Sequence, residues 1–397
     1  MEEKHQPGKC VLNESYPNWS GGLSSRNSHH PRRVLMTADC VGGVWNYSLD
    51  LARALVELGV EVGIATMGPR PSQAQRAQAT QISMLRLFES DYKLEWMDSP
   101  WADVDAAGIW LLDLARDFRP QIVHLNGFSH AALAWNAPVV VVVAHSCVRS
   151  WWNAVKTEPI PKEFAQYTRR VSAALRCASL LVAPTNAMLA AIEQNYDLSV
   201  PKKVIPNGRF GLRHLSAEKK DFILTAGRLW DEAKGLQFLA QIAPAVKWPI
   251  YAAGKCRHPS GSYISLQNIK LLGYLDNDKL VEYLSAASIY AAPALYEPFG
   301  LTVWEAAFFG CALVLSDIPS FRENWTDAAL LIPTNDCAGW CAALNSLAED
   351  HESRSTLARQ AQNRAIDLRP EEIGSRYFAT YCGLLADHPT VNSLNFQ

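Results

Sequence analysis

The stretch that decides the fold is IYAAPALYEPFGLTVWEAAFFGCALVLSD, residues 289–317. Its two ends, 289–292 and 311–317, are short apolar runs of the kind that form buried strands of a parallel sheet. The residues between them predict a helix through 304–309, with Thr302 as its N-terminal cap. Parallel strands joined by a helix are the basic unit of α/β proteins, so the sequence predicts this fold class.

Two carboxylates, Glu297 and Glu305, lie around the junction between the loop and this helix. Pro298 favours extended geometry at the residue before it, so Glu297 is expected in the loop, whereas Glu305 is expected in the first turns of the helix. Gly300 allows close approach of a ligand, and the free N–H groups of a helix start suit a phosphate. The alternative is that these acids only complement the helix dipole.

The length, composition and charge of the chain limit the classes of function that it can have. Its 397 residues predict two domains, and 49% apolar with 19% charged residues is typical of a globular protein. A net charge of -2 gives no reason to expect nucleic acid. The nine cysteines are scattered, without zinc-type spacing, and fit a reducing cytoplasm. We therefore expect a cytoplasmic protein with no metal and no cofactor, and at most peripheral contact with the inner face of a membrane.

Alternating strand and helix patterns divide the chain into two series. The predicted units are a disordered or loosely attached tail (1–31), a first α/β domain (32–203), a second α/β domain (204–370), and a C-terminal helix that crosses back to the first domain, followed by a tail (371–397). The turn-rich segment 201–208 is expected to be the hinge between the two domains. The strands of the first series are predicted at 34–37, 60–65, 122–125, 139–144 and 180–183, and those of the second begin with 223–226, 250–253 and 269–272.

A pair of cations follows the first strand of the second series. Arg228 at the strand end and Lys234 before a predicted helix can reach the same anion, the first as a planar fork and the second as a point charge. The alternative is that Arg228 pairs with Asp231 or Glu232 at the surface.

The first series offers weaker candidates for a site. Gly42 and Gly43 lie between its first strand and first helix, where their amides can face a ligand or simply form a tight turn. His145 follows the valine-rich strand and can bond a sugar hydroxyl, whereas His124 fits a core position. Aromatic and amide side chains near the same loops are weak candidates for binding an acceptor: Trp45, Asn126 and Trp151.

These motifs jointly resemble the retaining glycosyltransferases of family 4, over roughly residues 34–385. The resemblance implies the GT-B fold, in which two Rossmann-like domains face each other across a cleft, the first for the acceptor and the second for the donor. It implies that Glu297, with the amides of Phe299 and Gly300, holds the donor sugar, and that Glu305 binds the ribose. It places Arg228 and Lys234 on the diphosphate.

The same resemblance gives the full set of expected residues. The catalytic ones are His145, Arg228, Lys234 and Glu297. The donor-binding ones are Gly42, Gly43, Arg228, Lys234, Gly273, Tyr274, Glu297, Phe299, Gly300, Leu301, Thr302 and Glu305. The sequence departs from the family pattern at Ser146, where relatives have an acid, and at Arg209 and Phe210 after the hinge motif. These departures weaken any inference about the acceptor.

The expected activity is a metal-independent, retaining transfer of a hexose from a nucleotide-diphosphate sugar to a hydroxyl acceptor in a glycan, a glycolipid or a small molecule. A UDP-sugar is favoured over a GDP-sugar. Two alternatives stay open within the same fold: a sugar-nucleotide epimerase and a non-catalytic sugar-nucleotide-binding protein. A glycosidase that uses Glu297 and Glu305 would leave the cations unexplained.

Overall fold

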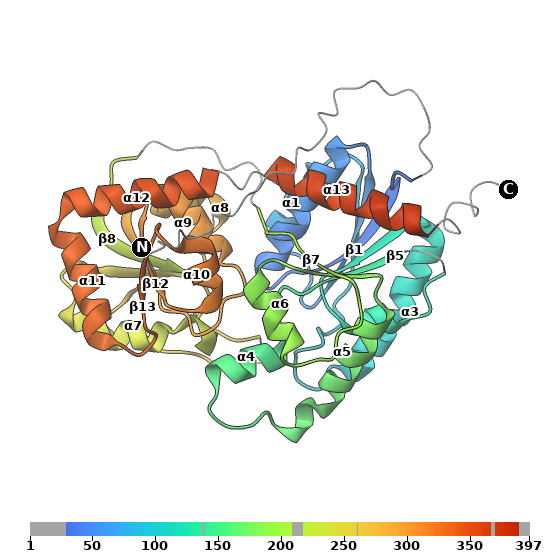
Figure 1. The fold of residues 1–397 in the computed structure, drawn as a ribbon, viewed down its shortest axis with the longest axis horizontal. Helices are drawn as coiled ribbons and strands as arrows, with labels where there is room; N and C mark the ends of the chain where they lie inside the picture. The colour runs from blue at the N-terminus through green and yellow to red at the C-terminus, as the bar shows by residue number, and fades with distance from the viewer. Residues whose placement is uncertain (1–28, 137–138, 209–216, 260, 367–369, 389–397) are drawn as a thin grey trace, which may run out of the picture.

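The computed structural model describes residues 29–136, 139–208, 217–259, 261–366 and 370–388. Figure 1 shows two sheets side by side, each with helices packed around it. The strand orders are β3-β2-β1-β4-β5-β6-β7 and β10-β9-β8-β11-β12-β13, and the strands within each sheet pair in parallel. This arrangement confirms the prediction of an α/β protein with two Rossmann-like sheets.

The first sheet and its helices come from the N-terminal half of the chain. Its strands are β1 Arg33–Asp39, β2 Glu61–Met67, β3 Leu85–Glu89, β4 Ile122–Leu125, β5 Val139–Val143, β6 Leu180–Ala183 and β7 Lys202–Val204. Its helices are α1 Gly43–Glu57, α2 Gln73–Thr80, α3 Trp101–Phe118, α4 Val148–Val155, α5 Ala165–Cys177 and α6 Asn186–Glu193, with single 3-10 turns at Ser129–Ala132 and Lys162–Phe164.

The second sheet follows in the same manner. Its strands are β8 Lys220–Ala226, β9 Ile250–Ala253, β10 Lys270–Gly273, β11 Ala287–Ala292, β12 Ala312–Ser316 and β13 Leu330–Ile332. Its helices are α7 Leu236–Ile242, α8 Asn277–Ala286, α9 Leu301–Phe308, α10 Pro319–Trp325, α11 Cys337–Glu349 and α12 His351–Ile366, with 3-10 turns at Glu232–Lys234 (η3) and Ala243–Ala245.

The central strands are buried on both faces. All five valines of β5 are buried, and they divide between two apolar clusters, one on each side of the sheet. β-Branched residues fit a pleated surface that is covered on both sides, and burial of each such side chain contributes roughly 1.5–3 kcal/mol. The valine run therefore fixes β5 in the middle of the sheet, and with it the position of the residues that follow.

The C-terminal helix α13, Pro370–Asp387, packs on α1 of the first sheet rather than on the second sheet. Figure 1 shows it lying across the top of that half of the molecule. Tyr377 and Tyr381 are fully buried in the same apolar cluster as the inner face of α1. Within the described part of the chain, no helix is both long and apolar enough to cross a membrane.

The whole segment 201–208 was expected to be a hinge, but part of it forms a strand. Residues 202–204 form β7, which pairs in parallel with β6 at the edge of the first sheet. Lys202 and Lys203 are exposed, as is common on an edge strand that must not pair further. Residues 205–208 follow the strand. Residues 1–28 of the predicted tail (1–31), and Arg209 with Phe210, lie outside the described residues.

Candidate functional site

The loop between β11 and α9 is the centre of the site. Gly300 is the N-cap of α9, with φ of +89° in the left-handed region that glycine tolerates best. The prediction that Thr302 caps the helix is therefore wrong, because the helix already begins at Leu301. Thr302 lies in the first turn, and its Oγ1 donates to the carbonyl oxygen of Ala226 at 3.4 Å. This bond ties the start of α9 to the end of β8.

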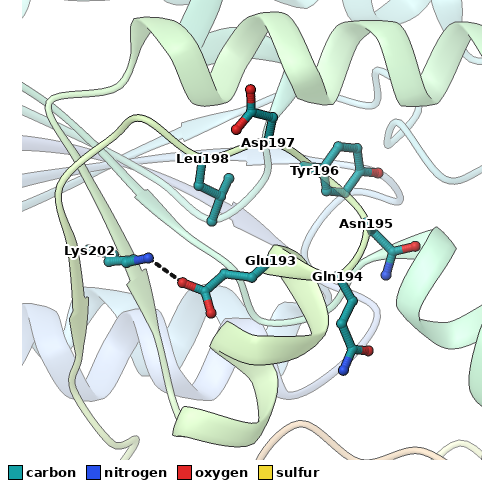
Figure 2. Close-up of a pocket in the computed structure, with 7 residues that line it drawn as sticks. All are labelled: Glu193, Gln194, Asn195, Tyr196, Asp197, Leu198 and Lys202. Carbon is teal, nitrogen blue, oxygen red and sulfur yellow. Dashed lines mark hydrogen bonds and ion pairs between the residues drawn. The ribbon is translucent and has the colours of Figure 1, made fainter.

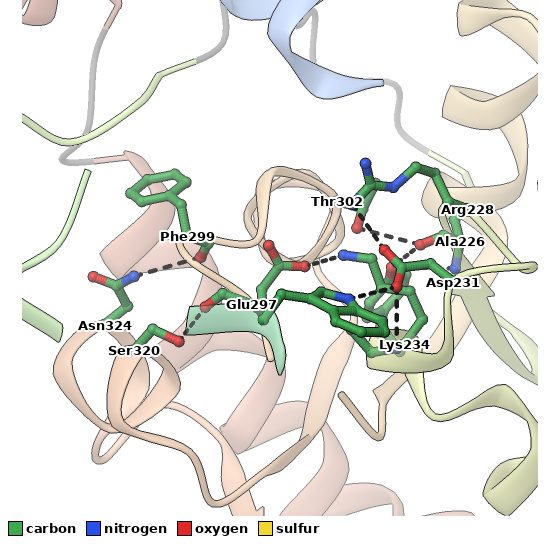
Figure 3. Close-up of polar contacts among 12 residues, drawn as sticks. Ala226, Arg228, Asp231, Lys234, Glu297, Phe299, Thr302, Ser320 and Asn324 are labelled. Atoms are coloured by element: carbon green, nitrogen blue, oxygen red, sulfur yellow. Dashed lines mark hydrogen bonds and ion pairs between the residues drawn. The ribbon is translucent and has the colours of Figure 1, made fainter. Parts of the chain in front are cut away.

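Helix α10 holds the same loop from the other side (Figure 3). Ser320 Oγ donates to the carbonyl oxygen of Glu297, and Asn324 Nδ2 donates to that of Phe299 at 3.5 Å. The Phe299 ring is buried, 4% exposed. The backbone of the loop is thus fixed at several points, which gives the Glu297 carboxylate a defined position beside the start of α9.

Lys234 meets this carboxylate at the end of η3. Its Nζ lies 2.5 Å from Glu297 Oε2, and both side chains are largely buried. The contact depends on Gly235, which has φ of +66° and whose added Cβ would lie only 1.9 Å from the carbonyl oxygen of Pro293. Any other residue would push the end of η3 away from the strand. The glycine therefore brings Lys234 to the loop before α9.

Arg228 lies beside this pair and has its own carboxylate. Its Nη2 donates to Asp231 Oδ2 at 2.8 Å. The pairing proposed as the surface alternative therefore exists, but Asp231 is buried, 6% exposed. The backbone N–H of Ala233 also donates to Asp231 Oδ1, at 3.1 Å. We call Arg228, Asp231, Lys234 and Glu297 the charged cluster; Figure 3 shows its side chains converging next to α9.

Glu305 lies in α9 and is buried, 5% exposed. Tyr290 of β11 lies nearby: burial raises the pKa of its hydroxyl, and the carboxylates of Glu305 and Glu297 raise it further. The two acids at this junction between loop and helix thus differ in environment, since Glu297 lies in the loop beside Lys234 and Glu305 is buried in α9.

The loop after β1 faces the charged cluster from the first sheet. A Cβ on Gly42 would lie 3.8 Å from Arg228 Nη1, and one on Gly43 would lie 3.1 Å from Leu301 Cδ1. Asp39 Oδ1 orders this loop by accepting the amides of Val41 at 2.9 Å and Gly42 at 3.1 Å. Burial raises the pKa of the Asp39 carboxyl, against the opposing effect of these amides and of Arg228.

Asp39 was not singled out from the sequence. The signal was a carboxylate at the end of the first strand, three residues before the glycine pair. Such an Asp can bond amides two and three residues ahead, as in an Asx-turn.

His145 follows β5 and belongs to a group of polar side chains in the first sheet. Its Nε2 and that of His124 both lie near Asn126 Oδ1, at 2.9 Å and 3.1 Å, and His124 Nδ1 lies 2.6 Å from the hydroxyl of Tyr381. We call these four residues the histidine network. Burial lowers the pKa of His124 and of His145 to about 3, and the neighbouring His124 lowers that of His145 further. Both imidazoles are therefore neutral near pH 7.

The two tryptophans that were expected to bind an acceptor have other partners. Trp45 is 3% exposed, packs in the apolar core and donates from Nε1 to Gln78 Oε1 at 3.0 Å. We therefore no longer consider Trp45 an acceptor-binding residue, because its side chain at the start of α1 points into the core. Trp151 of α4 donates from Nε1 to Asp231 Oδ1 at 3.0 Å, across the junction between the two sheets.

Gly273 and Tyr274 lie at the end of β10, on the same edge of the second sheet as Arg228. Backbone bonds join the three strand ends there: Gly227 donates to Ala253 at 3.0 Å and Gly254 to Gly273 at 2.8 Å. The Tyr274 ring is 70% exposed, with Lys255 Nζ at 5.2 Å from its centroid. The ring is thus free to stack on a flat ligand beside the charged cluster.

Several hydrogen bonds tie the two halves of the molecule together. Thr185 Oγ1 donates to the carbonyl oxygen of Pro298 at 2.9 Å. The carboxylate of Glu323 accepts the first two amides of α6, at Asn186 and Ala187, both at 2.8 Å. Together with the Trp151 bond to Asp231, these contacts hold α4 and α6 of the first half against the loops that carry the charged cluster.

An open hollow of about 500 Å³ lies elsewhere, at the far end of α6 (Figure 2). Its walls are polar and include the ion pair between Lys202 and Glu193. This end of α6 is opposite to the end that contacts Pro298, so the hollow is separate from the charged cluster. Among the described residues, no group of three His, Cys, Asp or Glu side chains is arranged to hold a metal ion.

Two family models match the chain in succession. "Glycosyltransferase Family 4" matches residues 41–209, and "Glycosyl transferases group 1" matches residues 220–350. The first therefore covers His124, Asn126 and His145 of the histidine network, but not Tyr381, and the second covers the charged cluster.

Curated relatives match shorter parts of the chain. The phosphatidyl-myo-inositol mannosyltransferase of Mycolicibacterium smegmatis is 34% identical over 100 residues, 24% of this chain and 26% of that protein. An N,N'-diacetylbacillosaminyl-diphospho-undecaprenol α-1,3-N-acetylgalactosaminyltransferase of Campylobacter jejuni is 27% identical over 176 residues, 43% of this chain and 46% of that protein. The chain thus spans less than half the length of these relatives.

Solved structures resemble the whole fold. Sucrose-phosphate synthase from Thermosynechococcus elongatus has a TM-score of 0.73 at 17% identity, covering 90% of this chain and 100% of its own. Anabaena HepE, solved with UDP and glucose, has a TM-score of 0.66 at 16% identity, covering 88% and 99%. These likenesses show the GT-B fold. The two family models, matched in succession, show that the chain belongs to the family 4 glycosyltransferases.

Proposed function

We propose that the protein is a retaining glycosyltransferase that moves a sugar from a nucleotide-diphosphate sugar to a hydroxyl acceptor. The observation that carries this proposal is the charged cluster, in which Arg228 and Lys234 lie beside the N-terminal end of α9 with Glu297. Two cations next to free helix amides form a site for a diphosphate. We propose residues 204–370 as the donor domain and 32–203 as the acceptor domain.

In this proposal each part of the cluster has one task. Arg228, Lys234 and the amides of Leu301 and Thr302 stabilise the negative charge that grows on the leaving diphosphate. Glu297, with the amides of Phe299 and Gly300, holds hydroxyls of the donor sugar. Two further tasks follow from position: Glu305 of α9 binds the ribose, and the base lies against Gly273 and Tyr274.

The ion pair of Glu297 argues against this residue as a nucleophile. A carboxylate that bonds a lysine at 2.5 Å is stabilised and less reactive than a free one. We propose instead that the bond from the anomeric carbon to the diphosphate breaks as the acceptor oxygen bonds the same carbon on the same face. The acceptor proton then passes to an oxygen of the leaving diphosphate.

A UDP-sugar is our proposed donor. Two solved structures of similar fold support it: Anabaena HepE with UDP and glucose, and an Escherichia coli trehalose-6-phosphate protein with UDP-2-fluoro glucose. The location that we propose is the cytoplasm, because the eight cysteines among the described residues are all unpaired.

The test begins with a thermal-shift panel of UDP-, GDP- and ADP-sugars, since a ligand that binds only the folded protein raises its melting temperature. The sugar that stabilises most is then incubated with hydroxyl acceptors, and the anomeric configuration of the product is determined by NMR. We expect a product with the anomer of the donor. An inverted product, a new isomer of the donor without any acceptor, or binding with no turnover would each contradict the proposal.

A further inference from the structure

The histidine network connects the C-terminal helix to His145. Tyr381 of α13 and His124 of β4 are both fully buried, and the hydroxyl of the tyrosine lies 2.6 Å from His124 Nδ1. On its other side, His124 Nε2 lies 3.1 Å from Asn126 Oδ1, which in turn lies 2.9 Å from His145 Nε2. Residues that are 257 positions apart in sequence therefore share one chain of hydrogen bonds.

The orientation of Asn126 sets the direction of this chain. Its Nδ2 lies 2.6 Å from the carbonyl oxygen of Thr37 and 3.1 Å from Ser48 Oγ. A backbone carbonyl only accepts, so the amide nitrogen must face it, and Oδ1 faces the two imidazoles. Because an amide oxygen only accepts, His145 carries its proton on Nε2. His124 Nε2 donates to the same oxygen, and the hydroxyl of Tyr47, 3.3 Å away, can serve as a second acceptor for this N–H.

The proton on His124 Nε2 fixes the role of Tyr381. A neutral imidazole has one N–H, so Nδ1 of His124 is an acceptor and the Tyr381 hydroxyl donates to it. Without this donor, His124 would be free to carry its proton on Nδ1, and its bare Nε2 would face the bare Asn126 Oδ1. Thr37 and Ser48 keep the amide nitrogen in place, so the amide does not turn. The repulsion instead displaces Oδ1 and weakens its hydrogen bond to His145 Nε2, and the tautomer of His145 is then held less firmly.

The remaining nitrogen of His145 is then an acceptor. Its ring is held edge-on against Tyr47 with centroids 4.4 Å apart. Among the described residues, no donor lies within hydrogen-bonding distance of Nδ1. Protonation would give the ring two N–H groups, and Nδ1 would then no longer be an acceptor. Burial lowers the pKa of His145 and keeps it neutral at neutral pH.

We propose that Tyr381 and His124 are positioning residues, which hold His145 in the Nε2-protonated tautomer so that its Nδ1 accepts a hydrogen bond from a hydroxyl of the bound sugar. The hydrogen bond to a sugar rests on the proposed function, whereas the tautomer of His145 can be tested without any substrate. In this arrangement the C-terminal helix does more than cover α1, because one of its hydroxyl groups selects the hydrogen-bonding character of a site residue.

The first experiment uses the full-length protein without ligand. The 15N shifts of the two ring nitrogens of His145 are measured at pH 7, with the signals assigned by their absence in His145→Gln. We expect the Nε2–H tautomer in the wild type and a mixture of tautomers in Tyr381→Phe. A wild-type His145 that is charged or protonated on Nδ1 would overturn the proposal, and so would an unchanged tautomer in Tyr381→Phe.

The matched control is Tyr377→Phe. Tyr377 lies one turn earlier on the same helix and is also fully buried, and its hydroxyl is directed towards that of Tyr47 rather than towards an imidazole. Its removal should leave the His145 tautomer unchanged. If Tyr381→Phe does not fold, His124→Gln removes the same link and is read by the same spectrum.

The second experiment measures turnover with a nucleotide sugar. We expect Tyr381→Phe to lower kcat/KM about 3- to 10-fold, as for the loss of one neutral hydrogen bond, with the affinity for free UDP unchanged. Tyr377→Phe should keep the wild-type value. A drop in both variants would show a merely structural role and would contradict the proposal. If no sugar is turned over at all, the proposed function fails while the 15N spectrum still decides the tautomer.

Discussion

The charged cluster and the histidine network lie on opposite sides of the junction between the two halves of the molecule. They accommodate their buried ionisable side chains in different ways. In the charged cluster each cation has a carboxylate partner, with Arg228 on Asp231 at 2.8 Å and Lys234 on Glu297 at 2.5 Å. In the histidine network the imidazoles carry no charge, because burial lowers the pKa of His124 and of His145 to about 3.

This difference indicates two kinds of recognition. An ammonium has three donors, so Lys234 can bind a phosphate oxygen while it keeps the Glu297 carboxylate, and neither charge is left bare. Neutral groups of fixed tautomer instead distinguish donors from acceptors, which suits the hydroxyls of a sugar. In the function that we propose, the second half of the molecule binds the charged donor and the first half orients hydroxyl groups.

The largest expected effect comes from removing a cation of the charged cluster. Lys234→Ala should lower kcat by about 10²- to 10³-fold, because one fixed charge that stabilises the leaving group is lost. Steady-state kinetics with the preferred nucleotide sugar measure this loss, and a melting curve checks that the variant folds. Lys279→Ala is the control, since Lys279 is exposed and pairs with Glu282 on α8. A drop of less than threefold in Lys234→Ala would refute its role.

The next effect concerns Glu305, which is buried in α9, whereas Glu297 lies in the loop beside Lys234. Glu305→Gln should weaken the binding of UDP by roughly 10- to 100-fold, because hydrogen bonds to a charged group contribute about 1.5–3 kcal/mol. Calorimetric titration with UDP, which has no donor sugar, isolates the ribose contact from that of Glu297. Glu297→Gln should therefore change UDP affinity much less; equal losses in both variants would contradict the division of roles.

Acid should weaken the histidine network through its neutral imidazoles. In the unfolded chain a histidine takes up its proton near pH 6.5, whereas in the folded protein both do so only near pH 3. The free energy of unfolding is then at its full value above pH 6.5. It falls as the pH drops from 6.5 towards 3, by up to about 1.4 kcal/mol per pH unit for each histidine.

Urea unfolding at pH 7, 6 and 5 measures this acid sensitivity. His124→Gln should lose less stability than the wild type between pH 6 and 5, because one fewer buried histidine then resists protonation; His145 and His130, whose pKa values burial also lowers, remain in both proteins. Around His124 lie the rings of Tyr47, Tyr377 and Tyr381, so no charged side chain among its ring neighbours competes for this effect. Identical slopes in the variant and the wild type would show that His124 is not held neutral.

The fold could be predicted from the sequence because local patterns decide it. The valine run of β5 and the strand–loop–helix unit around Glu297 each carry enough apolar periodicity to be recognised alone. β7 was missed because only three residues pair there and two of them are exposed lysines. An edge strand of this kind has almost the composition of a loop.

Parts of the site could not be predicted, because they depend on contacts between distant segments. Trp151 was expected near an acceptor, yet its indole bonds Asp231, 80 residues away, in the other half of the molecule. The bond from Tyr381 to His124 joins the last helix to the fourth strand. A pattern shows which residues lie at strand ends, but it does not show which of them become partners once two sheets are brought together.

The smallest expected effect tests the bond that joins the two regions. Trp151→Phe removes the donor to Asp231, the carboxylate that also holds Arg228, but keeps an aromatic ring in α4. We expect kcat/KM to fall about 2- to 10-fold, because one hydrogen bond is lost and Arg228 becomes less well fixed. Trp152→Phe is the matched control, since its indole donates to Glu158 within the same half of the molecule. Equal effects of the two substitutions would mean that α4 acts only through its packing, and that the charged cluster is oriented without help from the first half.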